Sequence, residues 1–118
     1  MKKNAVKEKS FAFAIRIVRL YRYLAEKKEH VLSKQLLRSG TAVGALIREG
    51  EHAESKQDFI HKMSIALKEA NETDYWLELL FQTDFLTEKE YAAIKKDCEE
   101  LIKLLVSIIK TSKINARK

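Results

Sequence analysis

The sequence predicts an all-α protein, an up-down-up-down antiparallel four-helix bundle. The 118 residues contain no proline and only three glycines, so residues that break helices are scarce. Apolar residues recur at spacings of three and four, which places them along one side of a helix. The connections between these periodic segments are short, as in antiparallel bundles. We expect helices at approximately residues 10–29, 33–50, 55–83 and 88–111, within a single domain covering residues 1–118.

The first segment, residues 10–29, carries its apolar seam at Ala14, Ile17, Tyr21 and Leu24. Phe11, Phe13 and Leu20 widen this apolar stripe. Three arginines in the same segment also step by three residues, which places them roughly along one side of the helix. These arginines are Arg16, Arg19 and Arg22.

The second segment, residues 33–50, is predicted to begin at Ser33 as its N-cap and to end at Gly50. Glycine accepts the left-handed conformation that commonly ends a helix. The seam consists of Leu36, Gly40, Val43 and Ile47. Small residues cluster here, and glycine inside a helix costs about 1 kcal/mol relative to alanine. We therefore expect another backbone to approach Gly40 and Gly44 closely, from the same chain or from another subunit.

The third and fourth segments each begin with a capping signal. Ser55 with Asp58 resembles a capping box, and Thr87 with Glu90 is a stronger one. The third seam is apolar except for Thr73 and otherwise consists of Phe59, Met63, Ala66, Ala70, Leu77 and Leu80. The fourth seam consists of Tyr91, Ile94, Cys98, Leu101, Leu105 and Ile108. Ile102 and Ile109 add a second apolar line, which is more apolar surface than a simple four-helix core needs.

A polar network is predicted between the second and third segments. If the turn between them centres near Ala53, Arg38 lies opposite Glu69 and about one turn from Glu72. Gln35 then lies roughly opposite Glu72. Glu49 shares a face with Arg38 but lies at the other end of the helix, near Asp58, His61 and Lys62. We interpret the set as structural, fixing the register of the two helices; it consists of Gln35, Arg38, Glu49, Glu69 and Glu72.

No catalytic constellation is evident, and we expect neither an enzyme nor a cofactor. Glu49 and His52 have the Glu-x-x-His spacing of di-iron bundles, but those sites need a second such motif, so no metal is predicted. Cys98 lies on an apolar seam, as a small core residue would. With no signal peptide, no membrane-spanning run and a single cysteine, the sequence indicates a cytoplasmic protein.

Charge points to a partner that is itself acidic. The net charge is +6, and its excess lies in residues 1–31 (+6) and 87–118 (+3), whereas residues 55–86 carry −3. Such an excess suits RNA or DNA; the competing interpretation is a solubilising surface with basic tails. The candidate nucleic-acid-binding residues are Arg16, Arg19, Arg22, Lys2, Lys3, Lys110 and Lys113.

The sequence from Gln35 to Glu72 resembles a bacterial family first noted as reading frames inside intervening sequences of 23S ribosomal RNA genes. Its motif is approximately Gln-x-x-Arg-Ser, then x-Ile-x-x-Asn-Ile-x-Glu-Gly, then Ser-x-x-[Asp/Glu]-Phe opening a helix that carries Ala and Glu. The matching residues are Gln35, Arg38, Ser39, Val43, Ile47, Glu49, Gly50, Ser55, Asp58, Phe59, Ala66 and Glu72. Leu46 departs from the pattern, since it stands where the family usually has asparagine.

The resemblance implies a left-handed four-helix bundle that assembles as a homopentamer. It also implies similarity to the accessory protein of diversity-generating retroelements, which binds nucleic acid and a reverse transcriptase. We therefore expect a non-enzymatic, oligomeric helical bundle that binds RNA or DNA through basic surfaces. The alternative is a scaffold subunit that recruits a protein partner, such as a reverse transcriptase, without binding nucleic acid directly.

Overall fold

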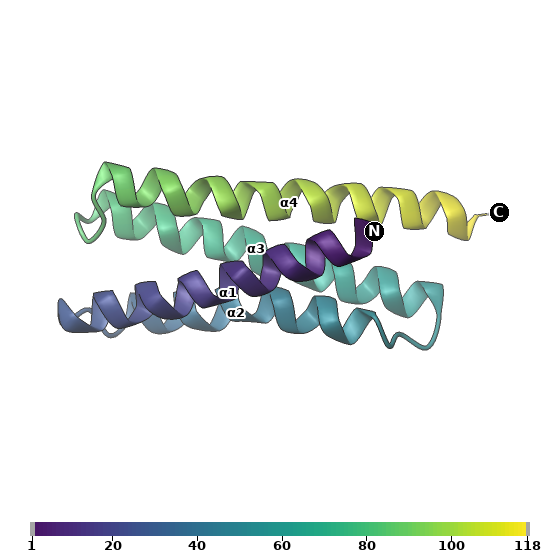
Figure 1. The fold of residues 1–118 in the computed structure, drawn as a ribbon, viewed down its shortest axis with the longest axis horizontal. Coiled ribbons are helices and arrows are strands. Elements are labelled where there is room, and N and C mark those ends of the chain that lie inside the picture. The colour runs from purple at the N-terminus through teal and green to yellow at the C-terminus, as the bar shows by residue number, and fades with distance from the viewer. Residues whose placement is uncertain (1, 118) are drawn as a thin grey trace.

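Four antiparallel helices form a rod of 51 × 21 × 21 Å (Figure 1). The structure is a computed structural model that describes residues 2–117, and it describes side chains from residue 5 onward. The helices are α1 (Lys2–Glu26), α2 (Leu32–Gly50), α3 (Lys56–Gln82) and α4 (Glu88–Ala116). Successive helices pack side by side, and α1 also touches α4. The predicted all-α bundle is confirmed, with no strand within residues 2–117.

The first helix begins eight residues before the expected start at residue 10, and α4 runs five residues past the expected end at 111. Val6 explains the early start, because its side chain is only 3% exposed. It lies seven residues before Phe13 and therefore extends the same buried face. That face is formed by Phe13 and Ile17, whereas Ala14 and Tyr21 of the predicted seam are only half-buried.

Close contact with α1 of the same chain explains Gly40 and Gly44: a side chain approaches Gly40 and a backbone approaches Gly44. A Cβ on Gly40 would lie 2.8 Å from Cγ1 of Ile17, and a Cβ on Gly44 would lie 3.3 Å from the carbonyl oxygen of Ser10. Both contacts belong to α1. Gly40 and Gly44 therefore serve packing within one bundle, so they give no support to a contact between subunits.

α2 ends at Gly50 as predicted, but the expectation that Gly50 adopts the left-handed conformation is wrong. No glycine among residues 2–117 has a positive φ, and a Cβ on Gly50 would lie 2.4 Å from Cε of Met63. Gly50 thus makes room for the Met63 side chain. The left-handed residues are instead Lys28 and Asp84, each at the end of a helix. The backbone hydrogen bonds around both residues have the Schellman pattern, which closes α1 and α3.

The N-cap assignment of Ser33 is also wrong, because the carboxylate of Glu29 caps α2. The amides of Val31, Leu32 and Ser33 donate to this carboxylate over 3.3, 3.1 and 2.6 Å. Ser33 lies inside the helix, and its hydroxyl donates to the carbonyl of Glu29 over 2.8 Å. Burial of Glu29 raises its pKa, but the backbone hydrogen bonds outweigh burial, so the net pKa is lowered.

Glu29→Gln is expected to lower the free energy of unfolding at pH 7 by about 1 kcal/mol, because it removes the charge at the N-terminus of α2. A lowered folded-state pKa stabilises the protein above the unfolded pKa of about 4.3, and this contribution is lost as the pH falls through the folded pKa. The difference between variant and parent should therefore shrink below about pH 4. Urea unfolding at several pH values measures it, with exposed Glu26→Gln as the control. A difference that is constant with pH contradicts the capping role.

The two other predicted helix starts are present. Thr87 and Glu90 form a full capping box, with bonds of 2.8 and 3.1 Å. The hydroxyl of Ser55 accepts from the amide of Asp58 over 3.0 Å, but the carboxylate of Asp58 accepts from the amide of Glu54 instead of closing the box. None of the described helices has a stretch long and apolar enough to cross a membrane.

Most of the predicted α3 and α4 seams lie in the core. Phe59 and Tyr91, which begin these seams, are half-buried and pack against the core. On α4, Ile109 is buried at 9% exposure, whereas the predicted seam residue Ile108 is half-buried. Ile102 is also half-buried, and Val106, which lies between Ile102 and Ile109 in the sequence, is 49% exposed. The second apolar line of α4 thus contributes partly to the core and partly to the surface.

Candidate nucleic-acid interface

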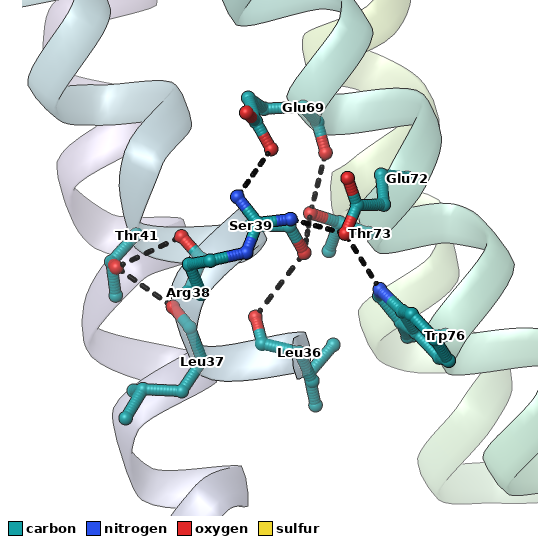
Figure 2. Close-up of polar contacts among 9 residues, drawn as sticks. All are labelled: Leu36, Leu37, Arg38, Ser39, Thr41, Glu69, Glu72, Thr73 and Trp76. Atoms are coloured by element: carbon teal, nitrogen blue, oxygen red, sulfur yellow. Dashed lines mark hydrogen bonds and ion pairs between the residues drawn. The ribbon is translucent and has the colours of Figure 1, made fainter. Parts of the chain in front are cut away.

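A polar network joins the middle of α2 to α3. Figure 2 shows Arg38 extending between the carboxylates of Glu69 and Glu72, with the indole of Trp76 beside Glu72. Arg38 Nη1 lies 3.1 Å from Glu69 Oε1, and Nη2 pairs with Glu72. Trp76 Nε1 donates to Glu72 over 3.0 Å. These hydrogen bonds, from Trp76 first and then from Arg38, lower the pKa of Glu72.

The pairing of Arg38 with both glutamates lies where counting outward from the α2–α3 turn predicts it. The Arg38 side chain is 51% exposed, and those of Glu69 and Glu72 are 15% and 31% exposed. Water therefore screens the guanidinium, and the network acts more through geometry than through Coulomb energy. Its position fits a contact that fixes the register of α2 against α3.

A buried pair of hydroxyls lies directly beneath this network. Ser39 and Thr73 are both 0% exposed, and their oxygens lie 2.9 Å apart. Thr73 Oγ1 is also 2.8 Å from the carbonyl oxygen of Glu69. A hydroxyl has one hydrogen, so Thr73 can donate to that carbonyl while Ser39 donates to Thr73. The single polar position in the α3 seam thus meets the serine that follows Arg38 in the sequence.

Gln35 and Glu49 lie outside this network. Gln35 is exposed and makes no side-chain hydrogen bond with the residues that the structure describes. Glu49 lies at the other end of α2 and pairs over 3.2 Å with Lys62, one of the three residues expected near it. Leu46, which replaces the family's asparagine, packs half-buried against the hydrophobic core. An apolar side chain therefore suits this position in this chain.

The residues that could act as metal ligands or as a nucleophile do not form a site. Within the described residues, no group of three or more His, Cys, Asp or Glu side chains could hold a metal ion. Glu49 is engaged with Lys62, and His52 and His61 are exposed. Cys98 is 0% exposed, and burial raises the pKa of its thiol to about 12. The thiol is therefore protonated near neutral pH and packs as a small core side chain.

The predicted arginines of α1 do not act as one group. Arg16 pairs with Asp97 of α4, beside a second ion pair of 3.1 Å between Lys9 and Glu100. These two pairs connect α1 to α4, along the side where α1 packs least. Arg19 and Arg22 are exposed, and neither forms an ion pair within the described part of the chain. The charge of Arg16 is thus partly neutralised, whereas the charges of Arg19 and Arg22 are free.

The predicted lysines lie near the chain ends. Lys110 and Lys113 are exposed on the last turns of α4. The side chains of Lys2 and Lys3 lie outside those that the structure describes, although both residues belong to the first turn of α1. α1 begins and α4 ends toward the same end of the rod (Figure 1). These lysines therefore flank one end of the bundle, whereas Arg22 lies toward the other end.

A row of lysines on α4, which the sequence interpretation missed, runs between these ends. Four exposed lysines recur every seven residues, namely Lys89, Lys96, Lys103 and Lys110. Seven residues are nearly two full turns, so the four share the solvent-facing side of α4 over about 31 Å. We call this set the α4 lysine row. The seven-residue spacing of the lysines could have revealed the row from the sequence. It was overlooked because the apolar seam of α4 has the same spacing.

The α4 lysine row makes no ion pair among residues 5–117. Four acids lie between its members in the sequence, namely Glu90, Asp97, Glu99 and Glu100. Three of them are engaged elsewhere: Glu90 with the amide of Thr87, Asp97 with Arg16 and Glu100 with Lys9. The row therefore presents four positive charges without an ion pair over about 31 Å, with exposed Glu99 beside Lys96 and Lys103. Multivalent anions such as nucleic-acid backbones suit such a surface, because each phosphate contact releases condensed counterions.

Comparisons with known proteins place these features in context. The family model described as 23S rRNA-intervening sequence protein matches residues 2–107. A crystal structure of a protein with unknown function from the S23 ribosomal protein family of Bacteroides thetaiotaomicron is similar to this chain, with 60% sequence identity and a TM-score of 0.92. The match covers 93% of this chain and 99% of that chain. Among curated proteins, none matches this sequence.

Proposed function

Because the chain belongs to the 23S rRNA-intervening sequence protein family, we propose that it is a non-enzymatic helical protein that binds RNA or DNA through phosphate contacts. The unpaired α4 lysine row is the observation that carries this proposal. Arg19 and Arg22 on α1 and Lys113 near the end of α4 are further exposed basic residues. The family description refers to 23S rRNA, which makes RNA the first probe to test.

The homo-oligomer that the family resemblance implies is part of this proposal. Several large apolar side chains remain exposed on a single bundle, among them Tyr75 at 57% and Val106 at 49%. A pentamer would cover some of this surface and would multiply the net charge of +6 by five. Light scattering on the samples used for the binding measurements gives their molar mass, and hence the number of subunits to which each affinity refers.

The proposal predicts salt-dependent binding that needs the α4 lysine row. Fluorescence anisotropy with mixed-sequence RNA and DNA, from about 50 to about 200 mM salt, gives the slope of log K against log salt. The double variant Lys96→Ala, Lys103→Ala should reduce the magnitude of this slope by about 2, because each substitution removes one phosphate contact. Affinity should fall for all sequences alike, since phosphate contacts do not read bases.

The matched control is Lys56→Ala with Lys68→Ala, which removes two exposed lysines from α3. It should leave the slope nearly unchanged. Absence of binding to both RNA and DNA at about 50 mM salt contradicts the proposed function, because phosphate-driven affinity is strongest at low salt. An equal change in both double variants would instead show that binding follows net charge and not the α4 lysine row.

The second candidate function is a scaffold that recruits a protein partner. The half-exposed apolar side chains favour it, since apolar surface with aromatic residues and arginine is typical of protein interfaces. Affinity purification yielding one stoichiometric protein, with no nucleic acid after nuclease-free handling, supports this function. Recovery of nucleic acid without a stoichiometric protein opposes it.

A further inference from the structure

The solvent-facing side of α1 differs in chemistry from the α4 lysine row. It combines apolar side chains with arginine, namely Phe11, Ile15, Arg19 and Arg22, together with Arg48 of α2; we call this set the α1 strip. Phe11 is 50% exposed and Ile15 is 38% exposed. Part of the strip lines a shallow hollow of about 340 Å³. From Phe11 to Arg22 it extends about 16 Å along the helix.

The exposed ring of Phe11 is held beside a guanidinium. Cζ of Arg48 lies 4.7 Å from the centroid of the Phe11 ring. This arrangement is a cation–π contact between two helices, and it joins two flat groups at the surface. Aromatic rings and guanidinium planes are both groups on which nucleic-acid bases stack. Ile15 continues the apolar surface one turn further along α1.

The arginines of the α1 strip are unpaired, whereas two other exposed arginines, Arg16 and Arg38, are paired. Arg16 pairs with Asp97, and Arg38 pairs with two glutamates. Arg19, Arg22 and Arg48 form no ion pair within the described part of the chain. Free guanidinium groups beside an exposed aromatic ring combine phosphate recognition with a surface for stacking.

We propose that the α1 strip binds single-stranded nucleic acid by stacking unpaired bases on Phe11 and Arg48, while Arg19 and Arg22 contact its phosphates. This inference rests on the proposed nucleic-acid binding and specifies the form of the ligand. A duplex keeps the faces of its bases stacked inside and offers the surface mainly phosphates, which the α4 lysine row can meet. Only a single strand has base faces that can reach Phe11 and Ile15.

The test compares a 20-nucleotide oligouridylate with a 20-base-pair RNA duplex by fluorescence anisotropy at about 100 mM salt. Phe11→Ala should weaken binding of the single strand about tenfold, because stacking on one aromatic ring is lost. It should change binding of the duplex by less than about twofold. Phe11→Trp should retain single-strand binding, and Arg48→Lys should weaken it although the charge is kept. Tyr75→Ala, at a 57% exposed aromatic residue on α3, is the matched control.

The outcomes separate this inference from the function on which it rests. If the parent binds both ligands and Phe11→Ala changes neither affinity, the α1 strip is not a stacking site, although nucleic-acid binding stands. If the parent binds neither ligand, both the inference and the proposed function are wrong. If Phe11→Ala weakens both ligands equally and lowers the mass by light scattering, the strip is a contact between copies of the chain. Circular dichroism establishes that each variant remains helical.

Discussion

Gly40→Val is expected to lower the free energy of unfolding by about 3 kcal/mol. The new side chain would overlap Ile17 of α1, because even a Cβ at this position lies 2.8 and 2.9 Å from the two Cγ atoms of Ile17. Ile17 is 0% exposed and β-branched, so its side chain has no free space and a stiff χ1 angle. Relief therefore requires α1 to move away from α2, which opens the core along their shared boundary.

Urea unfolding followed by circular dichroism measures this loss at one fixed protein concentration, because oligomerisation would make stability concentration-dependent. Ala45→Val is the matched control, since Ala45 is exposed on the same helix. It should cost about 0.5 kcal/mol, the difference in helix propensity. A loss below about 1 kcal/mol for Gly40→Val would show that α1 does not lie as close to α2 as described.

Thr73→Val is expected to cost about 2 kcal/mol although it preserves the shape of the side chain. Ser39 would lose its 2.9 Å partner in the core and would retain only the Leu36 carbonyl, at a long 3.4 Å. Leaving a buried hydroxyl poorly paired costs about 1–3 kcal/mol, whereas removing both partners can be nearly neutral. The double variant Ser39→Ala, Thr73→Val should therefore be more stable than Thr73→Val alone.

A double-mutant cycle built from urea unfolding of the parent, the two single variants and the double variant gives the coupling between Ser39 and Thr73. If the two losses simply add, the hydroxyls are not coupled and the hydrogen bond contributes nothing to stability. Thr41→Val is a useful control, because its hydroxyl bonds only to carbonyls of its own helix, over 2.7 and 3.4 Å.

Periodicity predicted the helices and much of the core because a buried face must recur with the helical repeat. Leu36, Val43 and Ile47 are buried as expected. The same regularity explains why counting along antiparallel helices brought Arg38 to Glu69 and Glu72. Each helix rises by a constant amount per residue, so the predicted pairing of opposite residues stays accurate over a few turns.

Helix ends were harder to predict because they depend on the path of the chain between helices. Ser33 has the composition of an N-cap, but the turn places the carboxylate of Glu29 over the free amides instead. α2 does end at Gly50, but the glycine is not left-handed there and instead makes room for Met63, thirteen residues away. Local preference cannot distinguish these cases, since the deciding contacts form only when the helices pack.

The candidate interface was predicted in part for a similar reason. Counting charge identified α1 and α4 as basic, but it could not show that Asp97 neutralises Arg16. The α4 lysine row was visible in the sequence as a seven-residue repeat of lysine. The α1 strip was not, because it depends on Arg48 of α2 lying against Phe11. Sites made from two helices require the packing of those helices to be known.

The two ion pairs between α1 and α4 make this boundary of the bundle sensitive to ionic strength. Elsewhere the helices are joined by extensive packing, but α1 packs only lightly on α4, and Arg16–Asp97 and Lys9–Glu100 lie at the surface between them. Exposed ion pairs weaken as salt screens them. Amide hydrogens of α1 should therefore exchange with solvent faster as salt is raised, while those at the α2–α3 boundary respond less. The stability of the α1–α4 boundary thus depends on salt, whereas that of the α2–α3 boundary depends mainly on packing.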